Sequence, residues 1–196
     1  MALLGIDRLL RRRAEPASRE DELVRLRARF RAQPSTREAG APAVECAKRL
    51  RALRVEISKA FADVTSCHTC ARGRAEPNGH WQGGSCCGGN TLDLFHAHEV
   101  AALKLVGISA RDLVPPRADH AGCTFRGAEG CVLPPEQRPN ICMRYICLEL
   151  RAELLEGSKD SGPRAERWRT IARLGAALRD EFAHLAELLE LLEPTR

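Results

Sequence analysis

The sequence has few aromatic residues and no long apolar run. Aromatic side chains make up 4% of the 196 residues, so the core must be built from Leu, Ala, Val and Ile, a composition that favours helices over sheets. No run of about 18 apolar residues occurs, which predicts that the chain does not span a membrane. The charges near the start follow a short apolar patch, and this is the wrong order for a secretory signal. We therefore expect a cytoplasmic, mainly α-helical protein.

Lysine is scarce as well. The 31 basic residues comprise 4 lysines and 27 arginines, and the formal net charge is +5. Arginine binds phosphate and carboxylate well. Along residues 19–31 and 164–181, however, the arginines alternate with Asp and Glu, which is typical of solvated helix faces. Because the only tight basic run is Arg11–Arg13, we do not expect the chain to bind nucleic acid.

The short motifs of the common enzyme classes are also missing. The sequence contains no phosphate-binding loop, no dinucleotide fingerprint and no serine nucleophile elbow. Asp93, Glu99 and Glu149 are isolated carboxylates on expected helices, where such groups are usually solvated. The sequence therefore assembles no catalytic constellation and does not predict an enzyme.

Two segments carry apolar residues at alternating intervals of three and four, which predicts amphipathic helices. The first runs from Ala43 to Val64, and the second follows the start signal Ser161-Gly162-Pro163. Their apolar positions are Ala43, Cys46, Leu50, Leu53, Ile57, Ala60 and Val64, then Trp168, Ile171, Leu178, Phe182, Leu185, Leu189 and Leu192. We expect an antiparallel bundle within one chain. In the alternative, the C-terminal helix forms a coiled coil with a second copy, so a monomer and a homodimer both stay open.

Three shorter helices are expected at residues 19–33, 90–107 and 145–156, and Gly107 is the stop signal of the second. The stretch from 33 to 42 is rich in helix breakers, so we expect the first of these helices to be loosely attached.

The expected organisation has three parts. Residues 1–42 form an N-terminal helical and linker segment, residues 43–157 form a cysteine-cluster domain with its leading helix, and residues 158–196 form an amphipathic helix that packs on that domain. The fold class is thus mainly α: a small helical domain with cysteine-rich metal-binding loops, flanked by long amphipathic helices.

Nine cysteines are present, and eight of them lie between residues 67 and 147. These eight are the candidate metal ligands Cys67, Cys70, Cys86, Cys87, Cys123, Cys131, Cys142 and Cys147. In a reducing compartment, clustered thiols are more often metal ligands or redox groups than structural disulfides. A disulfide-stapled protein is the alternative, although an odd total leaves one thiol unpaired. Cys46 lies on the apolar face of its helix and is expected to be a core residue.

The spacings indicate how the thiols could meet. The two residues between Cys67 and Cys70 allow a tight turn to bring both sulfurs to one metal at about 2.3 Å. The glycines between Cys123 and Cys131 predict a hairpin that makes these two neighbours. Cys142 and Cys147 would lie about 140° apart on a regular helix, so the helix must begin or bend between them.

Adjacent residues point apart, so Cys86 and Cys87 more easily serve two partners than one ion. One site and two sites both stay open. Histidines near the cysteine loops could replace a thiolate but are expected to be surface or supporting groups, namely His68, His80, His96, His98 and His120. His184, on the C-terminal helix, is expected at the surface.

The cysteine pattern resembles a known family. The segments Cys123-Thr-Phe, Gly130-Cys131-Val-Leu and Arg138-Pro139-Asn-Ile-Cys142-Met-Arg-Tyr-Ile-Cys147 are similar to the second half of the YkgJ-type cysteine-cluster family, whose members are described as zinc- or iron-chelating. The pairs at 67/70 and 86/87, followed by an apolar segment and Glu99, look like its first half. The resemblance covers about residues 67–150 and implies that these cysteines bind metal.

Our hypothesis from the sequence is a metal-binding protein that holds an iron–sulfur cluster, preferably of the 4Fe–4S type, or zinc, because sets of four thiolates suit both. Two alternatives concern its role: a zinc-stabilised, non-enzymatic module that binds a protein partner through its amphipathic helices, or an accessory protein that uses an accessible cluster in redox or group-transfer chemistry.

Overall fold

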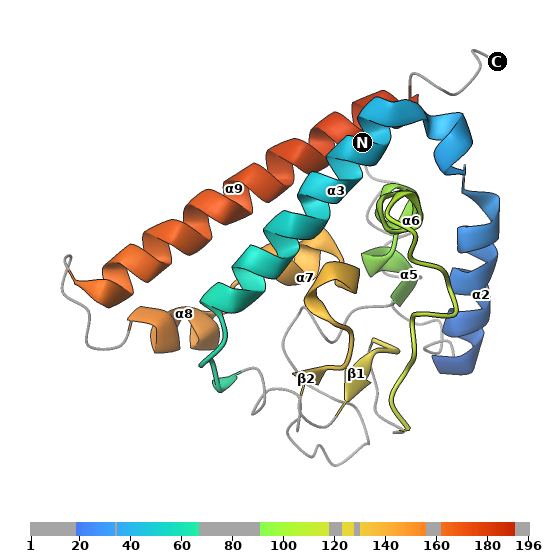
Figure 1. Ribbon diagram of the computed structural model, residues 1–196. Coiled ribbons are helices and arrows are strands. Elements are labelled where there is room, and N and C mark those ends of the chain that lie inside the picture. Colours follow the sequence, from blue (N-terminus) through green and yellow to red (C-terminus); the bar gives the residue numbers. More distant parts are fainter. Residues whose placement is uncertain are drawn as a thin grey trace, which may run out of the picture.

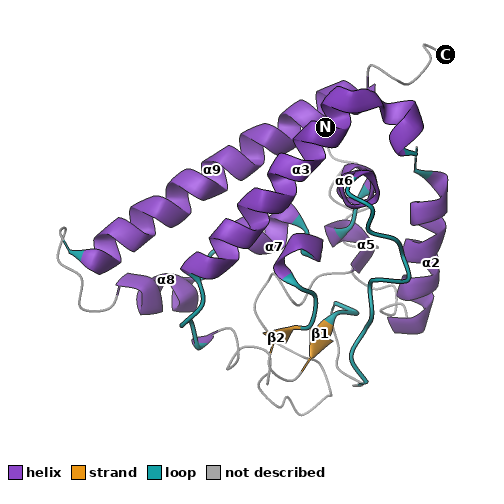
Figure 2. Cartoon of the chain, in the orientation of Figure 1, coloured by secondary structure: helices purple, strands orange, loops and turns teal. Residues whose placement is uncertain are grey.

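The computed structural model describes residues 19–33, 35–66, 91–117, 123–127, 130–155 and 162–190 (Figure 1). This part of the chain is mainly helical, as predicted, with one short two-stranded hairpin (Figure 2). No helix within these ranges is long and apolar enough to cross a bilayer.

The two longest helices, α3 (Thr36–Ala60) and α9 (Pro163–Glu190), lie side by side and run in opposite directions (Figure 1). Their predicted apolar faces meet in the main core, where Cys46, Leu50, Leu178 and Leu185 are fully buried. The core position of Cys46 is confirmed, and its thiol donates a hydrogen bond to the Glu181 carbonyl at 3.2 Å. The antiparallel pairing within one chain is therefore confirmed for the described residues.

Helix α3 differs from its prediction at both ends. It begins at Thr36 after Ser35, which forms a capping box with Glu38, and it is kinked at Gly40, whose φ is 76°. A residue with a side chain is strained at that φ, whereas Pro42 is tolerated because it stands at the start of the straight segment. The predicted end at Val64 is wrong, because the helix stops at Ala60.

The predicted helix at residues 19–33 is confirmed as α2 (Arg19–Ala32). It is not loosely attached. Leu26 and Phe30 are buried in a second apolar cluster, and the Arg29 guanidinium donates hydrogen bonds to the carbonyl oxygens of Leu92 and Phe95, both at 2.8 Å. The breakers after residue 33 therefore turn the chain without releasing the helix.

The helix predicted over residues 90–107 is interrupted. It forms α5 (Thr91–Leu94) and α6 (Ala97–Leu105), and Gly107 ends the second piece with a φ of 84° as predicted. The break at Phe95 buries its ring completely against Phe125, with ring centroids 5.4 Å apart. Burial of this aromatic side chain thus accompanies the interruption that the sequence did not predict.

Short elements connect α6 to α9. The strands β1 (Arg126–Gly127) and β2 (Gly130–Cys131) pair antiparallel with Arg126 opposite Cys131, which confirms the predicted hairpin. A 3₁₀ turn η1 (Pro135–Gln137) then leads to α7 (Asn140–Arg144) and α8 (Leu148–Leu155). The helix expected from residue 145 therefore starts at Leu148, and α7 was not predicted.

Candidate metal centre

Four of the eight candidate ligands line one cavity of about 140 Å³. Cys123 precedes the hairpin, Cys131 lies on β2, Cys142 lies on α7, and Cys147 directly precedes α8. The other four candidates fall outside the described residues, and these are Cys67, Cys70, Cys86 and Cys87. The structure thus brings together every candidate cysteine that it describes.

The bend predicted between Cys142 and Cys147 is present. Helix α7 ends at Arg144, and the three residues from Tyr145 to Cys147 are not helical. Because the chain changes direction there, both cysteines reach the same cavity, which one regular helix would not allow. The Cys147 sulfur accepts the Leu150 backbone N–H at 3.4 Å, so it lies at the start of α8.

Cys123 is held by contacts to its backbone and to its sulfur. Its carbonyl oxygen accepts the Arg19 guanidinium at 2.9 Å and the Arg126 backbone N–H at 3.0 Å. The Thr91 hydroxyl lies 4.0 Å from its sulfur. Burial raises the pKa of the Cys123 thiol to about 11, so without a bound cation this thiol stays protonated.

A buried carboxylate fixes the neighbours of Cys123. Glu22 accepts the Thr91 backbone N–H at 3.1 Å and the Thr124 hydroxyl at 3.2 Å, and it also accepts the Thr91 hydroxyl. The Thr91 hydroxyl oxygen in turn accepts the Thr124 backbone N–H at 2.9 Å. Helix α2 is therefore connected through one carboxylate both to the start of α5 and to the residue after Cys123.

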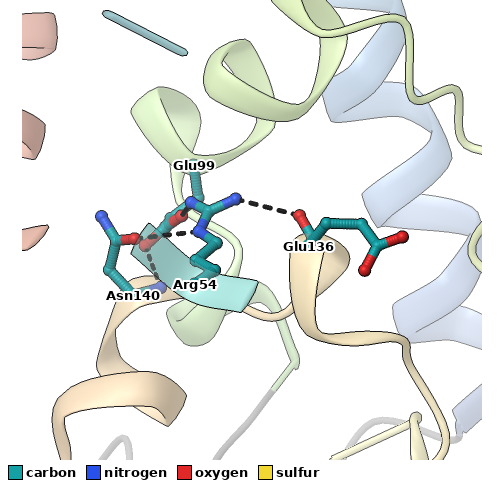
Figure 3. Close-up of polar contacts among 4 residues, drawn as sticks. All are labelled: Arg54, Glu99, Glu136 and Asn140. Carbon is teal, nitrogen blue, oxygen red and sulfur yellow. Dashed lines mark hydrogen bonds and ion pairs between the residues drawn. The ribbon is translucent and has the colours of Figure 1, made fainter. Parts of the chain in front are cut away.

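A second buried network lies at the start of α7 (Figure 3). The Arg54 guanidinium, from α3, contacts the Glu99 carboxylate, from α6, at 2.7 Å, and both side chains are about 1–2% exposed. The other Glu99 oxygen accepts the Asn140 backbone N–H at 2.7 Å. Arg54 also donates to the Asn140 side-chain oxygen at 3.1 Å and to the Glu136 carbonyl at 3.3 Å.

This network corrects the expectation that Glu99 is a solvated helical carboxylate. Burial raises the pKa of Glu99 to about 7, although the Arg54 charge and the Asn140 N–H oppose the shift. The same burial lowers the pKa of Arg54, because it disfavours the charged form of both groups. The pair fixes the first residue of α7, two positions before Cys142, so these two charges position a candidate ligand.

Basic side chains surround the cavity. Arg126 and Arg138 line it together with the cysteines, and Arg126 is buried. Arg138 donates hydrogen bonds to the Leu133 carbonyl at 2.8 Å and to the Cys131 carbonyl at 3.4 Å. A site of thiolate ligands carries negative charge, and nearby guanidinium groups stabilise the thiolate form.

A carboxylate also holds the chain where it approaches the cavity from α3. Glu153, on α8, accepts the backbone N–H groups of Thr65 at 2.7 Å and of Ser66 at 2.8 Å. Burial raises the pKa of Glu153, but the hydrogen bonds from Ser66 and Thr65 outweigh it and lower the pKa to about 2. Ser66, the residue before Cys67, lines the cavity.

The described histidines lie outside this cavity. His96 precedes α6, and its ring centroid lies 5.5 Å from that of Phe182 and 6.2 Å from that of His98. His184 is at the surface, as predicted. The described structure does not include His68, His80, His120 or the Glu149 side chain. Asp93 is exposed, as expected of a solvated carboxylate.

The donor chemistry fits zinc or an iron–sulfur centre, because the candidate ligands on the cavity wall are soft thiols. Their geometry is incomplete: in the described ranges no three His, Cys, Asp or Glu side chains lie close enough together to hold one ion. Comparison of the chain with family models, curated proteins and solved structures gave no match. The resemblance to the YkgJ-type family therefore stays a prediction.

Proposed function

We propose that the protein binds a metal centre through its clustered cysteines, an iron–sulfur cluster of the 4Fe–4S type in preference to zinc. One observation carries the proposal: Cys123, Cys131, Cys142 and Cys147 come from separate segments and line a single cavity. A packed core needs no such convergence of thiols, whereas a thiolate-bound centre does.

The described cysteines do not complete the ligand set, and the sequence contains four further cysteines between residues 66 and 91. Ser66 lines the cavity and is bonded to Cys67, which opens the segment that also carries Cys70, Cys86 and Cys87. This segment ends before Thr91, whose hydroxyl contacts the Cys123 sulfur. The four remaining cysteines thus belong to a stretch whose two flanking residues lie beside the described thiols.

The size of the cavity favours a cluster over one ion. A zinc ion holds its four sulfurs at about 2.3 Å, so a closed zinc site leaves little empty space. The cavity of about 140 Å³ is roughly ten times the ~10–15 Å³ that a cavity needs to hold one water molecule. A polynuclear centre needs such room, and this is our reason for placing iron–sulfur first.

The decisive experiment is anaerobic purification followed by iron, zinc and sulfide analysis and an ultraviolet–visible spectrum. We expect iron with acid-labile sulfide and a broad visible absorbance that dithionite bleaches. Cys123→Ser and Cys142→Ser should each lower the metal content. Cys46→Ser is the control, because Cys46 is a buried cysteine that lies in the helix pair and contacts Glu181. Metal-free protein, or full metal content in both ligand variants, would refute the proposal.

A second candidate function is a zinc-stabilised interaction module. Large apolar side chains are exposed next to two of the cysteines: Ile141 precedes Cys142, and Tyr145 and Leu148 flank Cys147. Exposed apolar side chains in one region are typical of protein-binding surfaces. A colourless protein with stoichiometric zinc would support this function, whereas a bleachable cluster would support redox or group-transfer chemistry at the half-buried Cys131, Cys142 and Cys147.

A further inference from the structure

A second hollow lies at the far end of α2 from Arg19 and is larger than the cysteine cavity. It is an open groove of about 860 Å³ between the last turns of α2, the end of α6 and the chain that follows α6. Figure 1 shows this chain running beside α2. The groove is lined by Arg27, Phe30, Arg31, Lys104, Gly107, Ile108, Ser109, Ala110 and Arg111.

Four of these side chains are basic, and none of the described lining residues is acidic. Arg27 and Arg31 are four residues apart and so lie on one face of α2, where two like charges repel. Lys104 and Arg111 add two more positive charges from the other side. The half-buried Ile108 and Ala110 add apolar side chains to the lining, together with the small exposed part of the buried Phe30.

Three arginines of the groove lack an acidic partner in the described ranges, whereas several basic residues on the long helices have one. On α3 and α9, several exposed arginines and lysines form ion pairs, including Arg49 with Glu181 at 2.6 Å and Arg167 with Asp63 at 3.0 Å. Arg27, Arg31 and Arg111 form no ion pair with an acidic side chain in the described ranges. The groove thus gathers three arginines that no acidic side chain in the described ranges neutralises, whereas residues such as Arg51 and Arg173 lack an acidic partner singly.

Nearby acidic groups are occupied by backbone contacts. The Glu38 carboxylate, whose pKa Lys104 helps to lower, caps the start of α3 at Ser35. Asp112 accepts both the backbone N–H and the hydroxyl of Ser109 at 2.7 Å. Neither lies in the groove lining.

Helix dipoles explain the positions of only two of the four basic residues in the groove. Arg31 and Lys104 stand in the last turns of their helices, where a cation complements the dipole. Arg27 precedes the last turn, and Arg111 lies outside any helix. The combination of these four cations around one concave, partly apolar surface therefore points to a ligand.

We propose that this groove binds a small molecule with two or more phosphate groups. Guanidinium groups bind phosphate oxygens bidentately, and the groove carries them on both of its sides. Its volume lies within the ~300–1,000 Å³ typical of small-molecule sites. The apolar residues of the lining can accept an uncharged part of the ligand. This site does not depend on the metal centre.

The test is isothermal titration of the full-length protein with inorganic tripolyphosphate as the probe, with ADP as a second probe that adds an apolar ring. We expect saturable binding of one equivalent of each probe. ADP should bind more tightly than pyrophosphate, which is titrated as the diphosphate control without a ring. Arg27→Gln and Arg111→Gln should each raise the dissociation constant about tenfold, since each removes one charge-assisted contact. Metal content is measured before and after titration, because tripolyphosphate chelates metals.

Arg25→Gln is the matched control. Arg25 is exposed on the same helix and has the same charge, but it does not line the groove. It should change the dissociation constant less than twofold. The proposal is overturned if wild-type protein does not bind the probes, if Arg25→Gln weakens binding as much as Arg27→Gln, or if a single-stranded oligonucleotide binds far more tightly than either probe.

Discussion

Removal of either member of the buried Arg54–Glu99 pair should destabilise the protein strongly, and the two losses should be unequal. Both side chains are almost fully buried, and their charged groups are 2.7 Å apart. Breaking a buried ion pair by removing one partner costs about 3–5 kcal/mol, because the other charge is left uncompensated. Native proteins are stable by only about 5–15 kcal/mol, so each variant should lose a large part of its stability.

The two stability losses should differ because the residue that remains can change its protonation state in one variant and not in the other. In Glu99→Leu the remaining guanidinium cannot lose its proton, so its charge stays buried. In Arg54→Met the remaining carboxyl can take up a proton, since burial raises the pKa of Glu99 and loss of the Arg54 charge raises it further. At pH 6 Arg54→Met should therefore cost less than Glu99→Leu, and its cost should increase towards pH 8.

The double variant Arg54→Met with Glu99→Leu removes both charges and should be more stable than the sum of the single losses indicates. It should not regain full stability, because the Asn140 N–H and the Glu136 carbonyl lose their partners. Each buried group left without a hydrogen bond costs about 1–3 kcal/mol.

Urea unfolding followed by far-ultraviolet circular dichroism at pH 6 and pH 8 measures all three variants, with a constant m-value as the check for two-state behaviour. Equal losses in the two single variants at pH 6, or a double variant whose loss is the sum of the single losses, would refute this account of the pair.

Two further predictions concern the scaffold. In Glu153→Gln the stability lost relative to wild type should be largest at neutral pH and vanish towards pH 2. The pKa of Glu153, about 2, lies below its usual 4.5, so the stabilising charge is present above this range and is lost as the pH falls through it. Urea unfolding at several pH values measures this difference, and a difference that does not change with pH would contradict it. Leu178→Ala should cost about 2–5 kcal/mol of stability, because the side chain is fully buried. Leu148→Ala, at an 80% exposed position, should change stability by less than about 0.5 kcal/mol in the same assay. Similar effects of the two substitutions would contradict the packing of α9.

Sequence periodicity predicted the helices that pack along their whole length. The apolar spacing of α2, α3 and α9 located them, because a repeat of 3.6 places those residues on one face. The same argument failed for α7, which has only five residues and is too short for a periodic signal. It also missed the break at Phe95, where the ring packs against Phe125, a residue distant in the sequence.

From the sequence, Glu99 is expected to be solvated and no buried role is expected for Glu22 or Arg54, although the spacing of these residues from apolar positions indicates burial. Glu22, Arg54 and Glu99 each stand four residues from a fully buried leucine on the same helix, and these leucines are Leu26, Leu50 and Leu103. Residues four apart share a helix face, so a charge at such a spacing lies on the apolar side and must find a buried partner. The partner itself could not be predicted, since Arg54 and Glu99 are 45 positions apart.

For the cysteines, local spacing predicted the hairpin and the bend but not the common cavity. The hairpin needs only the glycines between Cys123 and Cys131, and the bend needs only the angle between positions 142 and 147. Convergence of these segments depends on where α2, α3 and α6 hold them. That placement comes from non-local contacts that spacing does not encode.

The segments that carry the candidate ligands are too short to hold their own shape. A strand pair with two residues in each strand and a helix of five residues are both unstable in isolation. Their positions come instead from side chains of longer helices that bind their backbone, since Arg19 contacts Cys123 and Glu99 contacts Asn140. The scaffold thus orders the cysteine segments from outside, and a centre bound by their sulfurs would order them from inside. The two kinds of contact act on the same segments, so loss of a scaffold contact and loss of a ligand should both loosen the cavity while the α3–α9 pair persists.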